Sequence, residues 1–376
     1  MSRILLAPDS FKGSLSATQF CQIATQVIEA YAPQTEVISL PLSDGGEGFV
    51  DAYVTAGLAS RETLWVSNPL GRKIKAAYGW QQETQTAIIE MAQASGLPKI
   101  RPDERNPLQT HSLGTGQLIL AAIKQGAKRI ILGLGGSATN DGGAAALSAM
   151  GISAFDAKGK EVMLGGQGLG QVAEVGDIPP HLLEIEWVLA CDVTNPLLGD
   201  KGATAVFGPQ KGLQPQQFDI LEKGLENWAN VIQHKTGRDV RDLPGAGAAG
   251  GMAAGFIGLL DARIEPGFEV LRQSLQIDQA MEAVGGQAID WVITGEGRID
   301  EQTAYGKLPM RIAEMAKERD IPCIGICGSL GVSELEAFTS LFSIVNTPMH
   351  EVDAMTNAQP LFAACLQNLL PLMNLK

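Results

Sequence analysis

The chain opens with short apolar runs that alternate with amphipathic stretches. The runs at 4–7 and 36–40 are each closed by a proline, and their composition is typical of buried parallel strands. Residues 16–31 carry apolar side chains at helical spacing, and a second helical pattern follows at 47–55. This order predicts a β-α-β-α beginning with polar loops at the strand ends, where parallel sheets bind ligands.

The same alternation returns after residue 288. Apolar runs again alternate with helical patterns, so we predict that the two chain ends form one parallel sheet with helices on both faces. The predicted strands are 289–293, 322–326 and 342–345, and the predicted helices are 309–319, 333–338 and 357–373.

The middle of the chain has a different pattern. Short strands joined by tight turns at 62–91 predict a meander, and helices and strands are mixed after it. We therefore predict an α/β protein of two domains. Residues 1–63 and 288–376 form a parallel, three-layer domain that is Rossmann- or flavodoxin-like, and residues 64–287 form an inserted, mixed α/β domain. The other predicted elements of the middle are helices at 114–124 and 214–236 and strands at 129–132 and 186–190.

Three glycine-containing stretches of the middle need separate interpretation. We predict plain loops at 165–170 and at 204–212, the second with one cation, Lys211. Residues 245–250 match the spacing of a dinucleotide-binding turn, but that turn needs an apolar strand before it, and the preceding residues are charged and end at Pro244. We interpret this stretch as an Ala/Gly helix packed closely on the sheet.

Length and charge narrow the function classes. The 376 residues suffice for two domains, and 28 Lys and Arg against 41 Asp and Glu give a net charge of −13, which disfavours binding to nucleic acid or anionic membrane. The five cysteines are scattered and lack the paired spacing of metal ligands, which is typical of reduced thiols. With no export signal and no apolar run of the roughly 20 residues that a bilayer needs, we expect a cytoplasmic protein.

The glycine-rich stretch 133–143 is the strongest local signal. It follows the apolar run 129–132 and precedes an Ala-rich helical pattern, so its glycines and the free N–H groups of a helix start suit a phosphate. Asn140 and Asp141 add oxygen ligands of the kind that Mg²⁺ prefers. The alternative is a tight strand-to-helix turn capped by Asn or Asp.

Four loops at predicted strand ends combine glycine with a carboxylate: 9–12, 44–48, 135–143 and 295–300. Phosphoryl transfer needs positioning and charge neutralisation by backbone N–H groups, Lys or Arg, and Mg²⁺, and these loops supply those groups. No Gly-x-Ser-x-Gly elbow follows a strand, and Gly306-Lys307 is followed by Leu308 instead of the Ser or Thr of a Walker A loop. The residues alone indicate an anion-binding α/β enzyme of the phosphotransfer class.

Several motifs in register resemble the type I glycerate kinases. The resemblance runs across nearly the whole chain. It implies ATP-dependent phosphorylation of D-glycerate with Mg²⁺, with the 2-hydroxyl as the preferred position. It also implies a two-domain fold with the active site in the cleft between the domains. The motifs are Ala7-Pro-Asp-Ser-Phe-Lys-Gly-Ser14, Asp44-Gly-Gly-Glu-Gly48, Gly135-Gly-Ser-Ala-Thr-Asn-Asp-Gly-Gly143, Cys191-Asp-Val-Thr-Asn-Pro196, Phe207-Gly-Pro-Gln-Lys-Gly212 and Thr294-Gly-Glu-Gly-Arg-Ile-Asp300.

Residue roles follow from these motifs as hypotheses. Lys12 and Arg298 are expected to contact phosphate or the glycerate carboxylate, and Asp192 to orient or deprotonate the substrate hydroxyl. Asp141, Glu296 or Asp44 could hold Mg²⁺; for each acid the alternative is a cap or turn residue. The predicted sets are Asp192 and Lys12 for catalysis; Ser10, Asp44, Arg298 and Asn195 for substrate; Gly135, Gly136, Ser137, Thr139, Asn140 and Gly142 for ATP; and Asp141 and Glu296 for the metal.

Other functions remain open at this stage. Phosphorylation at the 3-hydroxyl is one, a protein that binds an anionic metabolite without chemistry is another, and a dehydrogenase rests only on the 245–250 pattern. The expected partners are D-glycerate and ATP, without nucleic acid or membrane, and a homo-oligomer is compatible with the sequence.

Overall fold

The chain divides into two units, each with its own sheet and core. Unit 1 comprises Met1–Asp44, Asp51–Leu58 and Phe268–Lys376, and unit 2 comprises Gly45–Val50 and Ala59–Gly267. The computed structural model describes residues 2–43, 45–283 and 287–375. The sequence-based domain boundaries at residues 63 and 288 stay a prediction.

Unit 1 has a five-stranded, fully parallel sheet in the order β13-β12-β11-β1-β2. This is the flavodoxin-like strand order, with a long insertion after the second strand. The prediction that both chain ends share one parallel sheet is confirmed. The strands are β1 (Arg3–Leu6), β2 (Glu36–Ser39), β11 (Trp291–Ile299), β12 (Cys323–Leu330) and β13 (Ser340–Ser343).

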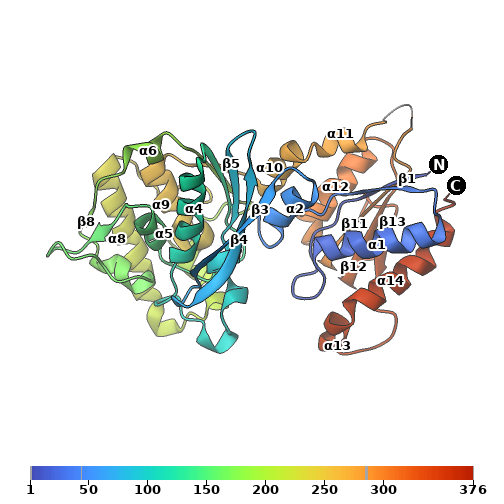
Figure 1. Ribbon diagram of the computed structural model, residues 1–376. Helices are drawn as coiled ribbons and strands as arrows, with labels where there is room; N and C mark the ends of the chain where they lie inside the picture. The colour runs from blue at the N-terminus through green and yellow to red at the C-terminus, as the bar shows by residue number, and fades with distance from the viewer. Residues whose placement is uncertain (1, 44, 284–286, 376) are drawn as a thin grey trace. The chain divides into compact units, whose positions relative to one another are not determined.

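Helices cover both faces of this sheet (Figure 1). One face carries α1 (Ala17–Tyr31) and α14 (Ala358–Leu369), whose rings Phe20 and Phe362 lie 4.1 Å apart within a core that includes alternate strand residues such as Ile4. α12 (Leu308–Lys317) packs on β11 and β12 outside that core. The remaining helical segments are α2 (Phe49–Thr55), which crosses into unit 2, α10 (Gly267–Ser274), α11 (Ile277–Met281), α13 (Glu351–Thr356) and the 3-10 turns Thr303–Tyr305 and Leu370–Leu372.

The start of α1 shows how the local sequence fixes an element. Ser16 accepts a hydrogen bond from the Gln19 backbone while the Gln19 side chain accepts one from the Ser16 backbone. This reciprocal capping box satisfies N–H groups that the helix itself leaves unbonded. It holds the helix directly behind the loop that follows β1.

Strand β11 is longer than the sequence predicted, and this corrects the expected loop at 295–300. The strand continues from Trp291 to Ile299 because β12 runs alongside it as far as Leu330, with residues 294–299 paired to 325–330. The segment predicted as a loop after Ile293 is therefore held by backbone hydrogen bonds. Glu296 and Arg298 lie on a strand.

The chain after β12 also differs from expectation. The predicted helix at 333–338 is wrong: this segment is irregular, with a turn at 336–337. The Phe338 ring lies 2.8 Å from where a Cβ at Gly325 would be. The predicted helix at 357–373 is divided into α14 and the 3-10 turn Leu370–Leu372, since Pro371 cannot continue an α-helix.

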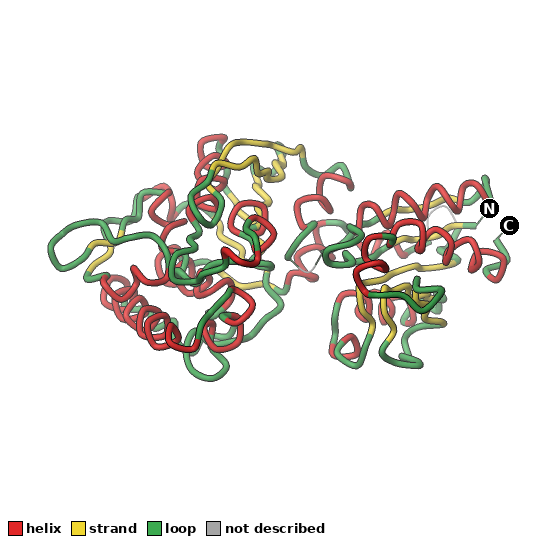
Figure 2. The backbone as a smooth tube through the Cα atoms, turned by 90° about the horizontal axis from the view of Figure 1, so that it is seen from below, coloured by secondary structure: helices red, strands yellow, loops and turns green. Residues whose placement is uncertain are grey.

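Unit 2 has a mixed six-stranded sheet in the order β10-β9-β6-β5-β4-β3. The pairs from β3 to β5 are antiparallel and the others parallel, which confirms the predicted meander and the mixed character. The elements can be followed in Figures 1 and 2. The strands are β3 (Ser60–Ser67), β4 (Lys73–Gln81), β5 (Thr86–Glu90), β6 (Arg129–Gly133), β9 (Glu186–Ala190) and β10 (Arg263–Glu265), with a small hairpin of β7 (Ala154–Phe155) and β8 (Glu174–Val175).

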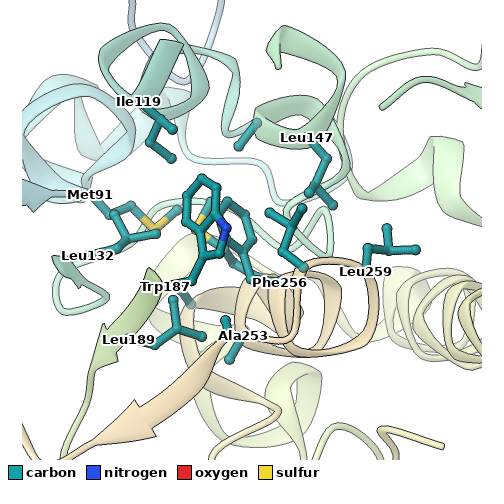
Figure 3. Packing of buried hydrophobic residues seen from close by; sticks show 14 of the residues in the cluster. Met91, Ile119, Leu132, Leu147, Trp187, Leu189, Ala253, Phe256 and Leu259 are labelled. Carbon is teal, nitrogen blue, oxygen red and sulfur yellow. The ribbon is translucent and has the colours of Figure 1, made fainter. Parts of the chain in front are cut away.

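The helices of unit 2 bury a large apolar core against the sheet (Figure 3). Trp187 of β9 meets Phe256 of α9 edge to face, with ring centroids 5.7 Å apart. The helices are α3 (Ala92–Ser95), α4 (Leu113–Gln125), α5 (Ala144–Ala149), α6 (Pro180–Leu183), α7 (Ala203–Phe207), α8 (Phe218–Thr236) and α9 (Ala248–Leu260), with 3-10 turns at Leu97–Lys99, Pro102–Glu104, Gly166–Gln171, Pro209–Lys211 and Pro215–Gln217.

The Gly245–Gly250 stretch follows no strand and leads into α9, so rejection of the dinucleotide turn is confirmed. The helix starts with three residues in left-handed conformation, Ala249, Gly250 and Gly251. Further along, Gly258 permits close approach to α8, because a Cβ there would lie 2.3 Å from Ile232 Cγ2. The small residues of this segment serve packing.

The two predicted loops at 165–170 and 204–212 are corrected. Both are largely helical, because close packing orders them: a Cβ at Gly166 would lie 2.4 Å from Leu221 of α8, and one at Gly208 2.3 Å from the Thr204 carbonyl oxygen. Over the described ranges, no helix combines the length and apolar character needed to cross a bilayer.

We expect Phe362→Ala to destabilise unit 1 by about 3–5 kcal/mol, because it removes a fully buried ring and leaves a cavity against Phe20. Urea unfolding followed by circular dichroism measures the change. Val352→Ala, at a side chain that is 73% exposed in the neighbouring helix, is the matched control and should shift the midpoint little. A midpoint equal to wild type for Phe362→Ala would contradict this account of the core.

Candidate functional site

The loop after β1 presents Lys12 at its tip. It begins beside β11, where the Asp9 N–H donates to the Gly295 carbonyl oxygen at 2.8 Å, and the Ser10 N–H donates to Asp9 Oδ1 at 2.7 Å. Phe11 and Leu15 close a small bridge around Gly13, whose φ of +80° suits glycine. Ser10 is buried at the base of this loop and Lys12 is exposed.

The extension of β11 carries two of the predicted site residues. Glu296 is 9% exposed and accepts a hydrogen bond from Thr303 Oγ1 at 2.8 Å, while Lys307 Nζ lies 3.4 Å from its other oxygen. Arg298, two residues further along the same face, is exposed and pairs with Asp300 at 3.0 Å. The predicted residues Glu296 and Arg298 therefore stand together at the end of the sheet.

Lys12 belongs to the same cluster. A Cβ at Gly297 would lie 3.6 Å from the Lys12 backbone nitrogen, so the loop after β1 runs close beside β11. Burial raises the pKa of Glu296. The pKa is lowered in part by the Thr303 hydroxyl and by the positive charges of Lys307 and Lys12. Unit 1 thus combines cationic and carboxylate groups at the carboxyl ends of β1 and β11, the switch point of this strand order.

In unit 2, the glycines at the start of the glycine-rich loop are required because another segment of the chain passes close to them. A Cβ at Gly133 would lie 2.4 Å from the Gly45 carbonyl oxygen, and one at Gly135 would lie 2.5 Å from Gly46 Cα. The Gly135 N–H donates to Gly45 at 3.1 Å. The stretch after Gly45 therefore crosses the carboxyl end of β6; the neighbouring Asp44 lies outside the described residues.

The backbone N–H groups at the helix start, which were expected to bind phosphate, already form hydrogen bonds within the protein. The N–H groups of Gly142, Gly143, Ala144 and Ala146 donate to protein oxygens. Gly142 has a φ of +60°, and a Cβ there would lie 2.5 Å from the Trp228 ring. The part of the loop that reaches solvent is Gly135 and Gly136: Gly135 is half-buried and Gly136 is exposed, whereas Ser137 is 7% exposed and Thr139 and Asn140 are fully buried.

Asp141 lies beneath this loop and is buried. Its Oδ2 accepts two hydrogen bonds of 2.8 Å from the Ser112 backbone and hydroxyl, and its Oδ1 accepts one from the Gly143 N–H at 3.3 Å. These bonds fasten the loop to the start of α4. The sequence analysis missed Ser112, and its position just before a predicted helix was the only available signal.

Lys211 was read as a loop cation but is fully buried. Its Nζ donates to the Thr139 carbonyl oxygen at 2.8 Å. Burial lowers the pKa of Lys211 to about 7 from 10.5, against the opposing charge of nearby Asp141. The glycine-rich loop, to which Thr139 belongs, holds two buried side-chain oxygens that accept no hydrogen bond from any described residue: Thr139 Oγ1 and Asn140 Oδ1.

The loop after β9 carries Asp192 and Asn195. Asp192 is exposed and follows Ala190, which pairs with Gly133 of β6 in the sheet, so Asp192 and the glycine-rich loop share one sheet edge. Asn195 Nδ2 donates to the Lys201 carbonyl oxygen at 2.8 Å. On the other side of β6, the buried Glu90 ends β5, a carboxylate that the sequence analysis passed over although it closes an apolar run.

A metal would have few protein ligands here. Within residues 2–43, 45–283 and 287–375, no group of three or more His, Cys, Asp or Glu is arranged to hold an ion. Mg²⁺ bound with nucleotides typically uses one or two carboxylates plus phosphate oxygens and water. Glu296 with the adjacent Asp300 fits that donor set.

Comparison with known proteins gives consistent matches over the whole chain. A family model described as the glycerate kinase family matches residues 4–374. The protein named glycerate 2-kinase from Escherichia coli K12 is 42% identical over 92% of this chain and 91% of its own length. Glycerate kinase from Halalkalibacterium halodurans is 40% identical over 98% of this chain and 97% of its own. The crystal structure of a protein designated glycerate kinase 2 from Salmonella typhimurium LT2 superimposes with a TM-score of 0.83 at 40% identity, covering 99% of this chain and 98% of that one.

Lys211→Met should make the stability of the protein less dependent on pH. The unfolded chain keeps the lysine proton up to pH 10.5 and the folded chain only up to about 7, so wild-type stability rises with pH across this window. We therefore expect Lys211→Met to be more stable than wild type near pH 6, with the difference shrinking toward pH 10.

Urea unfolding of both proteins at several pH values measures this difference. Lys158→Met replaces an exposed lysine of the same unit and is the control. A difference between Lys211→Met and wild type that stays constant with pH would contradict the assigned burial of the charge.

Proposed function

The chain belongs to the glycerate kinase family, and we propose that it transfers the γ-phosphoryl group of ATP to the 2-hydroxyl of D-glycerate, giving 2-phospho-D-glycerate and ADP. The observation that carries this proposal is the match over residues 4–374. Family membership makes the protein a phosphotransferase with an alcohol acceptor. The choice of the 2-hydroxyl rests on the relative named glycerate 2-kinase, which is 42% identical.

The cluster of unit 1 supports binding of anionic oxygens. Phosphoryl transfer is catalysed mainly by positioning and by neutralising charge, and Lys12 and Arg298 supply two exposed cations at the sheet's switch point. We propose that they contact phosphate or the glycerate carboxylate, for which the planar guanidinium of Arg298 is well suited. Ser10, Asp44 and Asn195 complete the proposed substrate set, and of these Asp44 lies outside the described residues.

We propose that the nucleotide phosphates contact the part of the glycine-rich loop that reaches solvent, Gly135 and Gly136, next to the buried Ser137. Glycine without a side chain allows a ligand to approach the backbone closely. Thr139, Asn140 and Gly142 were predicted to bind the nucleotide directly. In our proposal they support the loop from below, since these residues are buried and Gly142 is fixed by Trp228.

Of the metal candidates within the described residues, Glu296 is favoured over Asp141. Asp141 is 1% exposed and fastens the loop through Ser112 and Gly143, whereas Glu296 is 9% exposed, has Asp300 nearby and stands in the cationic cluster. When bound, Mg²⁺ would neutralise charge on the β- and γ-phosphates. Thr303 would keep the Glu296 carboxylate oriented through its hydroxyl.

Asp192 is the proposed residue for the reacting hydroxyl. It is exposed at the carboxyl edge of the unit 2 sheet, and a carboxylate near the attacking oxygen can orient it and accept its proton. A cytoplasmic location and a homo-oligomeric state remain predictions.

Incubation of the protein with Mg-ATP and D-glycerate should give a glycerate-dependent phosphorus NMR signal that coincides with authentic 2-phosphoglycerate. Reactions without glycerate are the control. A signal of 3-phosphoglycerate would confirm the kinase activity and correct the position of phosphorylation. Tight binding of glycerate without any product would contradict the kinase assignment and favour a metabolite-binding protein.

Asp192→Asn should lower kcat by roughly 10²–10⁴-fold, the usual contribution of a positioned acid or base, with little change in thermal stability. The matched control is Asp200→Asn, at an exposed carboxylate of the same loop. Turnover of Asp192→Asn within a few-fold of wild type would remove Asp192 from the mechanism.

A further inference from the structure

Lys307 occupies a position that local energetics do not favour. It is the N-cap residue of α12, makes no side-chain capping bond, and the first turn of the helix has no acidic residue. N-caps are usually Ser, Thr, Asp or Asn, and a cation at a helix N-terminus is repelled by the helix dipole. The fold reaches this arrangement through Gly306, whose φ of +90° turns the chain into the helix.

The contacts of Lys307 compensate only weakly for this placement. Its Nζ lies 3.4 Å from Glu296 Oε2 and 3.9 Å from Asp300 Oδ1, so it stands between two carboxylates without a close bond to either. On the same helix, Lys317 pairs with Glu336 at 2.7 Å. An ammonium group has three donors, and the Lys307 side chain is 38% exposed, so part of it faces solvent.

The residues around Lys307 are joined by hydrogen bonds. Thr303 Oγ1 donates to Glu296 at 2.8 Å and accepts from the Asp300 N–H at 3.1 Å, which fixes both carboxylates relative to the turn. The Lys307 N–H donates to the Thr303 carbonyl oxygen at 3.3 Å, and the Arg311 N–H to that of Lys307 at 3.1 Å. The backbone that carries Lys307 is therefore set against the end of β11.

We propose that Lys307 is a further catalytic residue whose ammonium group binds an anionic oxygen of the reactants, either of the ATP phosphates or of the glycerate carboxylate. This inference rests on the proposed function and adds a third cation to Lys12 and Arg298. In the structure, the ammonium lies between the carboxylates of Glu296 and Asp300. An incoming oxyanion offers the ammonium group a closer partner. The N-terminal end of α12 also favours the negative charge of that oxyanion.

The test uses the full-length protein with Lys307→Met, Lys307→Arg and the control Lys317→Met, which removes a lysine and its ion pair from the same helix. ATP affinity is measured by calorimetry without glycerate, and KM for D-glycerate and kcat from initial rates. Losing a hydrogen bond to a charged group corresponds to roughly 10–150-fold. We expect Lys307→Met to change at least one constant by that factor, Lys307→Arg to recover part of it, and Lys317→Met to stay within about twofold.

The three constants identify the oxyanion. A weaker ATP affinity assigns Lys307 to the nucleotide phosphates, a higher KM for D-glycerate assigns it to the carboxylate, and a lower kcat alone assigns it to the phosphoryl group in transfer. Unchanged constants in Lys307→Met, with or without a lower melting temperature, would overturn the proposal while wild type still phosphorylates glycerate. A wild-type protein that does not phosphorylate glycerate would instead refute the proposed function.

Discussion

The close crossing of two backbone segments is the constraint on which the glycine-rich loop depends. Gly45 and Gly46 pass so near to Gly133 and Gly135 that a Cβ at either of the latter would lie within 2.5 Å of the crossing chain. Protein interiors are packed too densely to absorb such an overlap, so neither position tolerates a side chain without a backbone shift. Much of the glycine content here is therefore required by the fold. The crossing also places Gly136, the exposed residue of the loop that directly follows Gly135.

The fold was predictable where local patterns decide it and not where distant segments do. The strand 186–190 and the helix that begins behind Ser16 were predicted from their apolar patterns, and the capping box that the structure shows at Ser16 also acts within a few residues. The continuation of β11 to Ile299 was missed because its backbone bonds come from β12, and the sequence of β11 itself, with two glycines and two charges, looks like a loop. The helix predicted at 333–338 is wrong for the opposite reason, since its local helical pattern is overridden by the packing of the Phe338 ring against Gly325, a distant residue.

The candidate site shows the same division. Lys12, Glu296 and Arg298 were selected from motifs at strand ends, and the structure brings them to one sheet edge. Asp141 has the side chain of a metal ligand, but its Oδ2 accepts both hydrogen bonds of Ser112. Ser112 lies 29 positions earlier, and the local pattern marks it only as a residue before a helix, not as a partner of Asp141. Lys211 was predicted only as a cation in a loop, because the burial of its charge cannot be seen in a stretch of glycine and proline. The predicted and the missed residues differ in which groups their side chains contact, and only the three-dimensional structure shows those contacts.

The left-handed start of α9 has an evolutionary consequence. Ala249, Gly250 and Gly251 all have positive φ, and a Cβ at Gly250 would lie 2.1 Å from the Thr139 carbonyl oxygen. A side chain there would displace the glycine-rich loop, and the left-handed backbone at Gly250 independently disfavours one. Two segments more than a hundred residues apart in sequence thus constrain each other, because a side chain fits at Gly250 only if both the loop and the start of α9 change conformation.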